Sequence, residues 1–165
     1  METSETDRIV RRTVLRAPRS RVWKAITDAK QFGAWFGLEA SAPFVAGTKI
    51  EAKIVPTQVD DAIAERQKDA EGITFPMWIE EIVPERRFSF RWHPGGDPPE
   101  DPDNEPTTLV TFELEEVEGG VLLTVTESGF DRIPLAKRAK AFEMNSDGWT
   151  IQMQLVEKYL ARATA

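Results

Sequence analysis

Apolar residues in the last part of the chain recur at the spacing of an α-helix. From residue 133 to residue 163 they fall on one side of a single long amphipathic helix. The side that we expect to face the core comprises Leu135, Arg138, Phe142, Asn145, Trp149, Gln152, Met153, Val156 and Leu160. The opposite side is charged or polar and is expected to face water. Gly148 interrupts this helix, and we expect it to let a ring or strand approach the backbone.

Upstream of this helix, apolar and polar residues alternate in short runs, which is the pattern of half-buried β-strands. The runs are residues 49–55, 73–79, 87–92, 110–114 and 121–125, and residues 8–17 are also β-prone. The run at 8–17 mixes apolar and basic residues on both sides, so we expect it near a sheet edge. Pro76 predicts either an edge position or a bulge for its own strand.

Two short helices are predicted directly after the first strand. Pro18 can open the first, over residues 19–27, and Asp28 can cap the second, which Gly37 ends. Residues 56–72 resemble an insertion in a hairpin, with one marginal helix capped by Thr57. Residues 94–106 are rich in Pro, Gly and acidic residues, so they predict an exposed loop.

These elements predict an α+β fold in a single domain, residues 1–165. A curved antiparallel sheet would wrap around the long C-terminal helix, with the two short helices after strand one. The apolar face of such a sheet must be covered, and the terminal helix is the predicted element whose apolar side is broad enough.

Two amides interrupt the apolar side of the terminal helix. Asn145 and Gln152 lie two turns apart, where one ligand could contact both. Burying an amide without a hydrogen-bond partner costs about 1 to 3 kcal/mol. Each amide therefore bonds to the sheet or to trapped water, or lines a wet cavity.

Glu127 continues the inward register of Leu123 and Val125, which places a carboxylate at the end of the same space. A buried and unpaired carboxylate there could act as a general acid or base. The alternative is that Glu127 pairs with an arginine, for which Arg138 is the candidate, or that it reaches solvent.

Aromatic residues accompany these polar groups. Trp92 and Trp149 either fill the core or form the wall of a pocket for a flat or apolar ligand. Together with other residues at inward positions of the predicted strands and terminal helix, they form the predicted ligand-binding set. Its members are Phe75, Phe90, Trp92, Glu127, Asn145, Trp149, Gln152 and Met153.

Composition excludes several classes of function. With 28 acidic and 21 basic residues the net charge is -7, which argues against binding to nucleic acid. The chain has no cysteine and one histidine, His93, so we expect no metal site, no thiol nucleophile and no cofactor. Ser128 and Ser146 lack a convincing base, and Gly95-Gly96 is not followed by a helix start that could hold a phosphate. We therefore assign no catalytic residue.

The chain is expected in the cytoplasm. Its N-terminus, METSETDR, is polar, and no apolar run approaches the ~20 residues that a membrane span needs.

Four sequence blocks in this order resemble a known family: RAPRSRVWKAITDAKQFGAWFG, IVPERRFSFRWHP, LTVTESGFD and MNSDGWTIQMQLVEKYL. Together they are similar to the START-related helix-grip (SRPBCC) superfamily. More narrowly, they resemble bacterial proteins similar to the C-terminal domain of the activator of Hsp90 ATPase. The resemblance implies a sheet that grips a C-terminal helix, with a deep cavity that accepts lipids, steroids, polyketides or hormones. It does not imply a single activity, because fold does not fix function.

Three hypotheses follow. The first is binding of a small hydrophobic or amphipathic molecule in a cavity between sheet and terminal helix, with Asn145, Gln152 and Glu127 as polar anchors. The second is an interaction module with a chaperone of the Hsp90 type as partner. The third is a cyclase or hydrolase that uses Glu127 or His93 as acid or base.

Overall fold

The computed structural model describes residues 7–95 and 99–162. The strands are β1 (Arg8–Leu15), β2 (Leu38–Ala40), β3 (Lys49–Ile54), β4 (Thr74–Val83), β5 (Arg87–Trp92), β6 (Thr108–Val117) and β7 (Gly120–Ser128). The helices are α1 (Arg19–Thr27), α2 (Ala29–Phe36), α3 (Asp61–Gln67) and α4 (Leu135–Arg162), with short 3-10 turns at Lys68–Ala70 (η1) and Phe130–Arg132 (η2).

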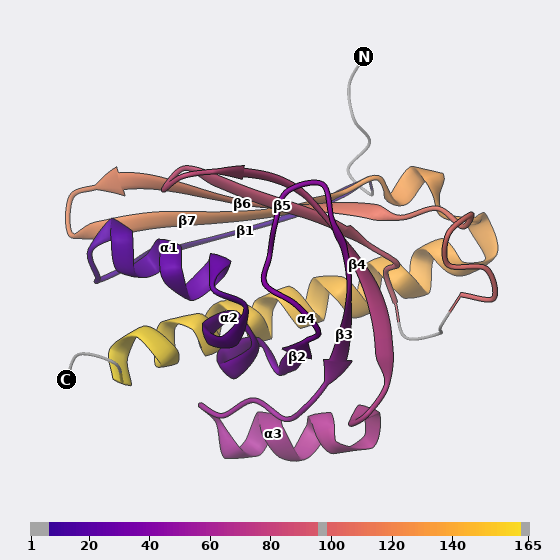
Figure 1. Cartoon of the computed structure of the whole chain (residues 1–165), viewed down its shortest axis with the longest axis horizontal. Helices are drawn as coiled ribbons and strands as arrows, with labels where there is room; N and C mark the ends of the chain where they lie inside the picture. The colour runs from indigo at the N-terminus through magenta and orange to yellow at the C-terminus, as the bar shows by residue number, and fades with distance from the viewer. Residues whose placement is uncertain (1–6, 96–98, 163–165) are drawn as a thin grey trace.

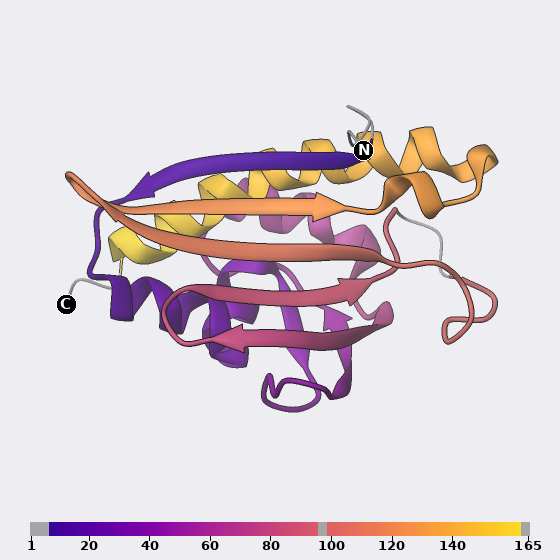
Figure 2. The same ribbon diagram turned by 90° about the horizontal axis from the view of Figure 1, so that it is seen from above.

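The seven strands form one curved antiparallel sheet in the order β1-β7-β6-β5-β4-β3-β2 (Figure 1). The helices lie on one side of this sheet, and α4 runs along its length (Figure 2). The predicted α+β helix-grip architecture is therefore confirmed. None of the helices in the described part of the chain lies over the other face of the sheet (Figure 1 and Figure 2).

The strand positions settle two predictions. β1 lies at the sheet edge, as its mixed pattern indicated. β4 lies between β3 and β5, so an edge position for this strand was wrong, and the bulge was right because the register shifts between Ile79 and Glu81.

The signals for α1 and α2 act as expected. The Asp28 side chain accepts hydrogen bonds from the backbone N–H groups of Lys30 and Gln31, and Gly37 ends α2 with φ +98°. Gly33 is required by packing, because a Cβ there would lie 2.2 Å from the carbonyl oxygen of Leu38 in β2.

The cap of α3 differs from the prediction. Asp60 caps it by accepting from the backbone N–H of Ile63 at 2.9 Å, whereas the Thr57 hydroxyl donates to the carbonyl oxygen of Trp35 at 2.8 Å. Thr57 is buried among neighbouring carbonyl groups, so its hydroxyl bonds to the end of α2 instead of starting a helix.

Helix α4 begins two residues later than the prediction, and the predicted end at residue 163 lies outside the described residues. Leu135 is 78% exposed, so its assignment to the inward side was wrong. Phe130 and Ile133 fill that end of the core instead, with Phe130 in ring contact with Phe142 at 5.1 Å. The expectation for Gly148 was also wrong, because no described atom lies within 4 Å of the position of a Cβ there.

Candidate functional site

Glu127 is the centre of a buried hydrogen-bond cluster. Its side chain is completely buried, because β7 turns Val121, Leu123, Val125 and Glu127 toward the helices. The indole N–H of Trp92 and the hydroxyl of Thr108 donate to Oε2 at 2.8 Å and 2.6 Å. The indole N–H of Trp149 donates to Oε1 at 2.8 Å, and the Asn145 amide lies 2.9 Å from both oxygens. We call these five residues the Glu127 cluster.

The fold brings the cluster together from four elements. Trp92 is the last residue of β5 and pairs with Thr108, the first residue of β6. Glu127 belongs to the neighbouring strand β7, where it lies opposite Val110 of β6. Asn145 and Trp149 are four residues apart, so they share one side of α4.

The donor set determines what Glu127 can do. Its described partners are neutral donors. Arg138, the predicted partner, donates from its guanidinium to the carbonyl oxygens of Asp131 and Ile133. The predicted pairing of Glu127 with Arg138 was therefore wrong. Each carboxylate oxygen already accepts at least two hydrogen bonds, which is what its lone pairs allow in plane. The geometry gives Glu127 a positioning role, since it fixes the edges of both indoles.

Five rings form what we call the aromatic wall: Phe36, Phe75, Phe90, Trp92 and Trp149. Trp92 lies at its centre, with centroid distances of 6.0 Å to Phe36, 6.1 Å to Phe75, 5.2 Å to Phe90 and 5.9 Å to Trp149. Phe90 and Trp149 are buried, whereas Phe36, Phe75 and Trp92 are half-buried. Phe36, Phe75 and Trp92 are therefore not fully enclosed, and the ring of Trp92 contacts the rings of both others.

Gln152 adjoins this wall. Its amide Nε2 donates to the carbonyl oxygen of Phe36 at 3.0 Å, and its Oε1 is buried without a partner among the described residues. Met153, the next residue, is 7% exposed and belongs to the core.

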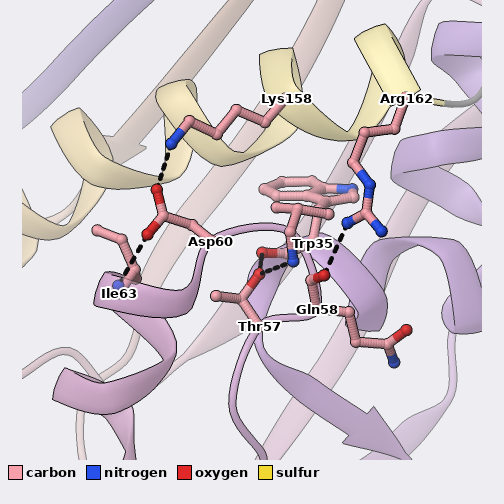
Figure 3. Close-up of polar contacts among 8 residues, drawn as sticks. Trp35, Thr57, Gln58, Asp60, Ile63, Lys158 and Arg162 are labelled. Carbon is pink, nitrogen blue, oxygen red and sulfur yellow. Dashed lines mark hydrogen bonds and ion pairs between the residues drawn. The ribbon is translucent and has the colours of Figure 1, made fainter.

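Residues 57–67, which we call the strap, join the end of α2 to the end of α4 (Figure 3). Arg162 donates to the carbonyl oxygen of Gln58 at 2.7 Å, and Lys158 forms an ion pair with Asp60. The hydrogen bond from Lys158 lowers the pKa of the Asp60 carboxyl, and the bond from the Ile63 amide adds to this effect. The strap is thus held by polar contacts, and α3 has no buried residue.

The structure brings together Trp92, Glu127, Asn145 and Trp149 by direct hydrogen bonds, and it adds Phe75, Phe90 and Gln152 as their surroundings. Sequence reasoning missed Thr108 and Phe36. The alternation of Thr108 with Val110 and Phe112 was a usable signal for the threonine. For Phe36 no such signal existed, since its contact with the wall depends on how α2 packs.

His93 does not join this site. Its Nε2 lies 2.7 Å from the carbonyl oxygen of Pro102 and its Nδ1 3.1 Å from that of Pro106. Whichever ring nitrogen carries the N–H, it donates to a carbonyl oxygen of the loop that follows β5. Part of the predicted 94–106 loop, residues 96–98, lies outside the described residues.

One groove of about 950 Å³ is lined by α2, by the segment from Leu38 to Phe44 and by the strap residue Gln58. Within residues 7–95 and 99–162, no group of three or more His, Asp and Glu side chains could hold a metal ion. The same residues contain no helix that is both long and apolar enough to cross a membrane.

Comparison with solved structures shows the same fold at low identity. Protein MLL2253 from Mesorhizobium loti superposes with a TM-score of 0.70 at 18% identity, over 96% of this chain and 99% of that one. A protein from Arthrobacter aurescens gives a TM-score of 0.73 at 17% identity, over 99% and 91%. DynU16, from the dynemicin biosynthetic locus, gives a TM-score of 0.66 at 24% identity. This chain is covered to 94% in that match but spans only 47% of DynU16.

The sequence comparisons define the family. No curated protein matches the chain. The family described as "Activator of Hsp90 ATPase homolog 1-like protein" matches residues 16–161, which include the first helix, the strap, the Glu127 cluster and nearly all of α4. With the observed architecture, this match shows that the chain belongs to the family of Activator of Hsp90 ATPase homolog 1-like proteins, within the START-related helix-grip superfamily.

Proposed function

We propose that this protein binds a small apolar or amphipathic molecule against the aromatic wall. The observation that carries the proposal is the group of three adjacent half-buried rings, Phe36, Phe75 and Trp92, on the helix-covered side of the sheet. Binding sites for small molecules are usually lined by aromatic side chains with a few placed polar groups.

The Glu127 cluster supports this proposal by fixing the wall. Trp92 and Trp149 both donate their indole N–H groups to the carboxylate. Trp149 is buried, so the surface offered to a ligand is the apolar ring of the half-buried Trp92. Each 100 Å² of apolar surface that a ligand buries there would contribute about 2.5 kcal/mol. Rings held in place before binding also lose less conformational freedom when a ligand arrives.

An enzymatic role for Glu127 has less support in this geometry. The carboxylate oxygens are surrounded by four donors, and a general base needs a lone pair directed at its substrate. His93, the other candidate, has each ring nitrogen beside a carbonyl oxygen of the loop after β5, to which its N–H donates.

The neutral dye N-phenyl-1-naphthylamine provides a direct test. We expect its fluorescence to rise on binding and the Trp92→Phe substitution to weaken its affinity at least fivefold, because half of the central ring surface is removed. Trp78→Phe is the matched control, because Trp78 lies on the other face of the sheet. There the Nζ of Lys49 lies 5.5 Å from the centroid of the Trp78 ring. Circular dichroism would verify that both variants are folded.

Two outcomes would overturn the proposal. One is that neither the dye nor any member of a lipid and aromatic library binds the wild-type protein. The other is that Trp92→Phe binds the dye as Trp78→Phe does. If the protein instead stimulates an Hsp90 ATPase and binds no apolar molecule, the chaperone hypothesis replaces this one.

A further inference from the structure

The side-chain carbonyl of Gln152 is a buried acceptor that lacks a donor. Its Oε1 is closed off from solvent and has no partner among residues 7–95 and 99–162. Buried polar atoms are nearly always paired in proteins, so such an atom calls for an explanation.

Turning the amide over does not remove this acceptor. Gln152 Nε2 donates to the carbonyl oxygen of Phe36 at 3.0 Å, and the reversed amide would place two oxygens against each other. The Phe36 oxygen also accepts from Nε2 of the strap residue Gln67 at 3.3 Å. This shared acceptor fixes which end of the Gln152 amide faces Phe36, so Oε1 is the end that does not bond there.

The donors of the Glu127 cluster are already used. Gln152 lies one turn after Trp149 on α4, and the Trp149 ring lies 6.0 Å from that of Phe36. The N–H groups of Trp92, Trp149 and Asn145 all bond to Glu127. A partner for Gln152 Oε1 must therefore come from outside the cluster.

We propose that Gln152 Oε1 is the polar anchor of the ligand and that it accepts a hydrogen bond from a hydroxyl or N–H group of an uncharged, flat molecule. The rings of that molecule would lie on the aromatic wall, so this inference rests on the proposed function. Neutrality follows from the surroundings. The wall and the cluster offer no cationic side chain to an anion, and the carboxylate of Glu127 is enclosed by its donors and unable to pair with a cation.

Three matched probes test this anchor: 2-naphthol, which carries a hydroxyl donor, 2-methoxynaphthalene, which carries none, and the anion 2-naphthoate. Calorimetric titration should show that wild-type protein prefers 2-naphthol to its methyl ether by about twofold to tenfold, the range of one net hydrogen bond. 2-Naphthoate should bind more weakly than 2-naphthol.

A variant pair assigns the preference to one residue. Gln152→Met should bind both neutral probes with equal affinity, whereas Gln154→Met, on the exposed side of the same helix, should keep the wild-type preference. Because Gln152→Met also loses the bond to Phe36, wild-type NMR provides a second measurement. The side-chain amide resonance of Gln152 should shift with 2-naphthol and much less with its methyl ether.

The outcomes separate this inference from the proposed function. The anchor is refuted if the two neutral probes bind wild type with equal affinity and shift the Gln152 amide resonance by the same amount. A water molecule then satisfies Oε1, and binding at the aromatic wall is unaffected. Tighter binding of 2-naphthoate than of 2-naphthol refutes the requirement for an uncharged ligand. If no probe binds at all, both proposals fall together.

Discussion

Replacing Glu127 by glutamine tests whether the carboxylate organises the cluster. The substitution keeps the shape of the side chain but exchanges one acceptor oxygen for an NH₂ group, which can only donate. The Thr108 hydroxyl can rotate and accept a hydrogen bond from the new NH₂ group, but an indole N–H can only donate. The indoles of Trp92 and Trp149 bond to different carboxylate oxygens. Whichever way the new amide points, one indole N–H faces another N–H.

The magnitude follows from these contacts. A hydrogen bond to a charged group contributes about 1.5 to 3 kcal/mol, and a buried donor left without a partner costs about 1 to 3 kcal/mol. Removing a fully buried charge offsets part of this loss, because an ionised carboxylate is costly to bury. We expect Glu127→Gln to lower the free energy of unfolding by about 2 to 4 kcal/mol, which corresponds to a fall in Tm of roughly 5 to 15 °C.

Urea unfolding followed by far-UV circular dichroism measures this change, and near-UV spectra report on the two indoles. Glu115→Gln, at an exposed position of β6, is the control and should stay within about 0.5 kcal/mol of wild type. Thr108→Val should fall between them, at about 1.5 to 2 kcal/mol, because it removes one hydrogen bond to the carboxylate but leaves no buried polar group without a partner. If Glu127→Gln is as stable as Glu115→Gln, the four donors do not hold the carboxylate and its positioning role is refuted.

Three further substitutions test the packing and the strap. Gly33→Ala should lower the free energy of unfolding by about 1 to 3 kcal/mol, because its Cβ would lie 2.2 Å from the backbone oxygen of Leu38; unchanged thermal unfolding would contradict that close approach. Gly148→Ala should instead raise it by about 0.5 to 1 kcal/mol, since the helix there has open space, and a loss in the same thermal scan would contradict this. Lys158→Gln should raise the pKa of Asp60 toward 3.8, as followed by the NMR signal of its carboxyl carbon. Since the folded pKa of Asp60 is lowered, the contact stabilises the strap above the ordinary value of 3.8 and is lost as the pH falls through the lower folded value. An unchanged titration midpoint in the variant would show that Lys158 does not hold the strap.

Local patterns predicted most of the architecture. The Asp28 cap, the Gly37 stop and the alternation on β5, β6 and β7 depend on residues close together in the chain, so the sequence alone identified them. The inward register of Glu127 followed from the same alternation. Errors arose where a distant segment decided the outcome, as for Thr57, which bonds to Trp35 in α2.

The amino-acid sequence by itself determined the order of most elements, the inward side of β5, β6 and β7, and the presence of Glu127, Asn145 and Gln152 among apolar residues. These properties depend on periodicity and on backbone preferences, which act over a few residues. Only the tertiary structure decided which donors surround Glu127 and that Gln152 Oε1 is buried without a partner among the described residues. The reason is geometric, because Trp92, Thr108 and Trp149 belong to three different elements, and a hydrogen bond forms only where packing brings donor and acceptor within about 3 Å.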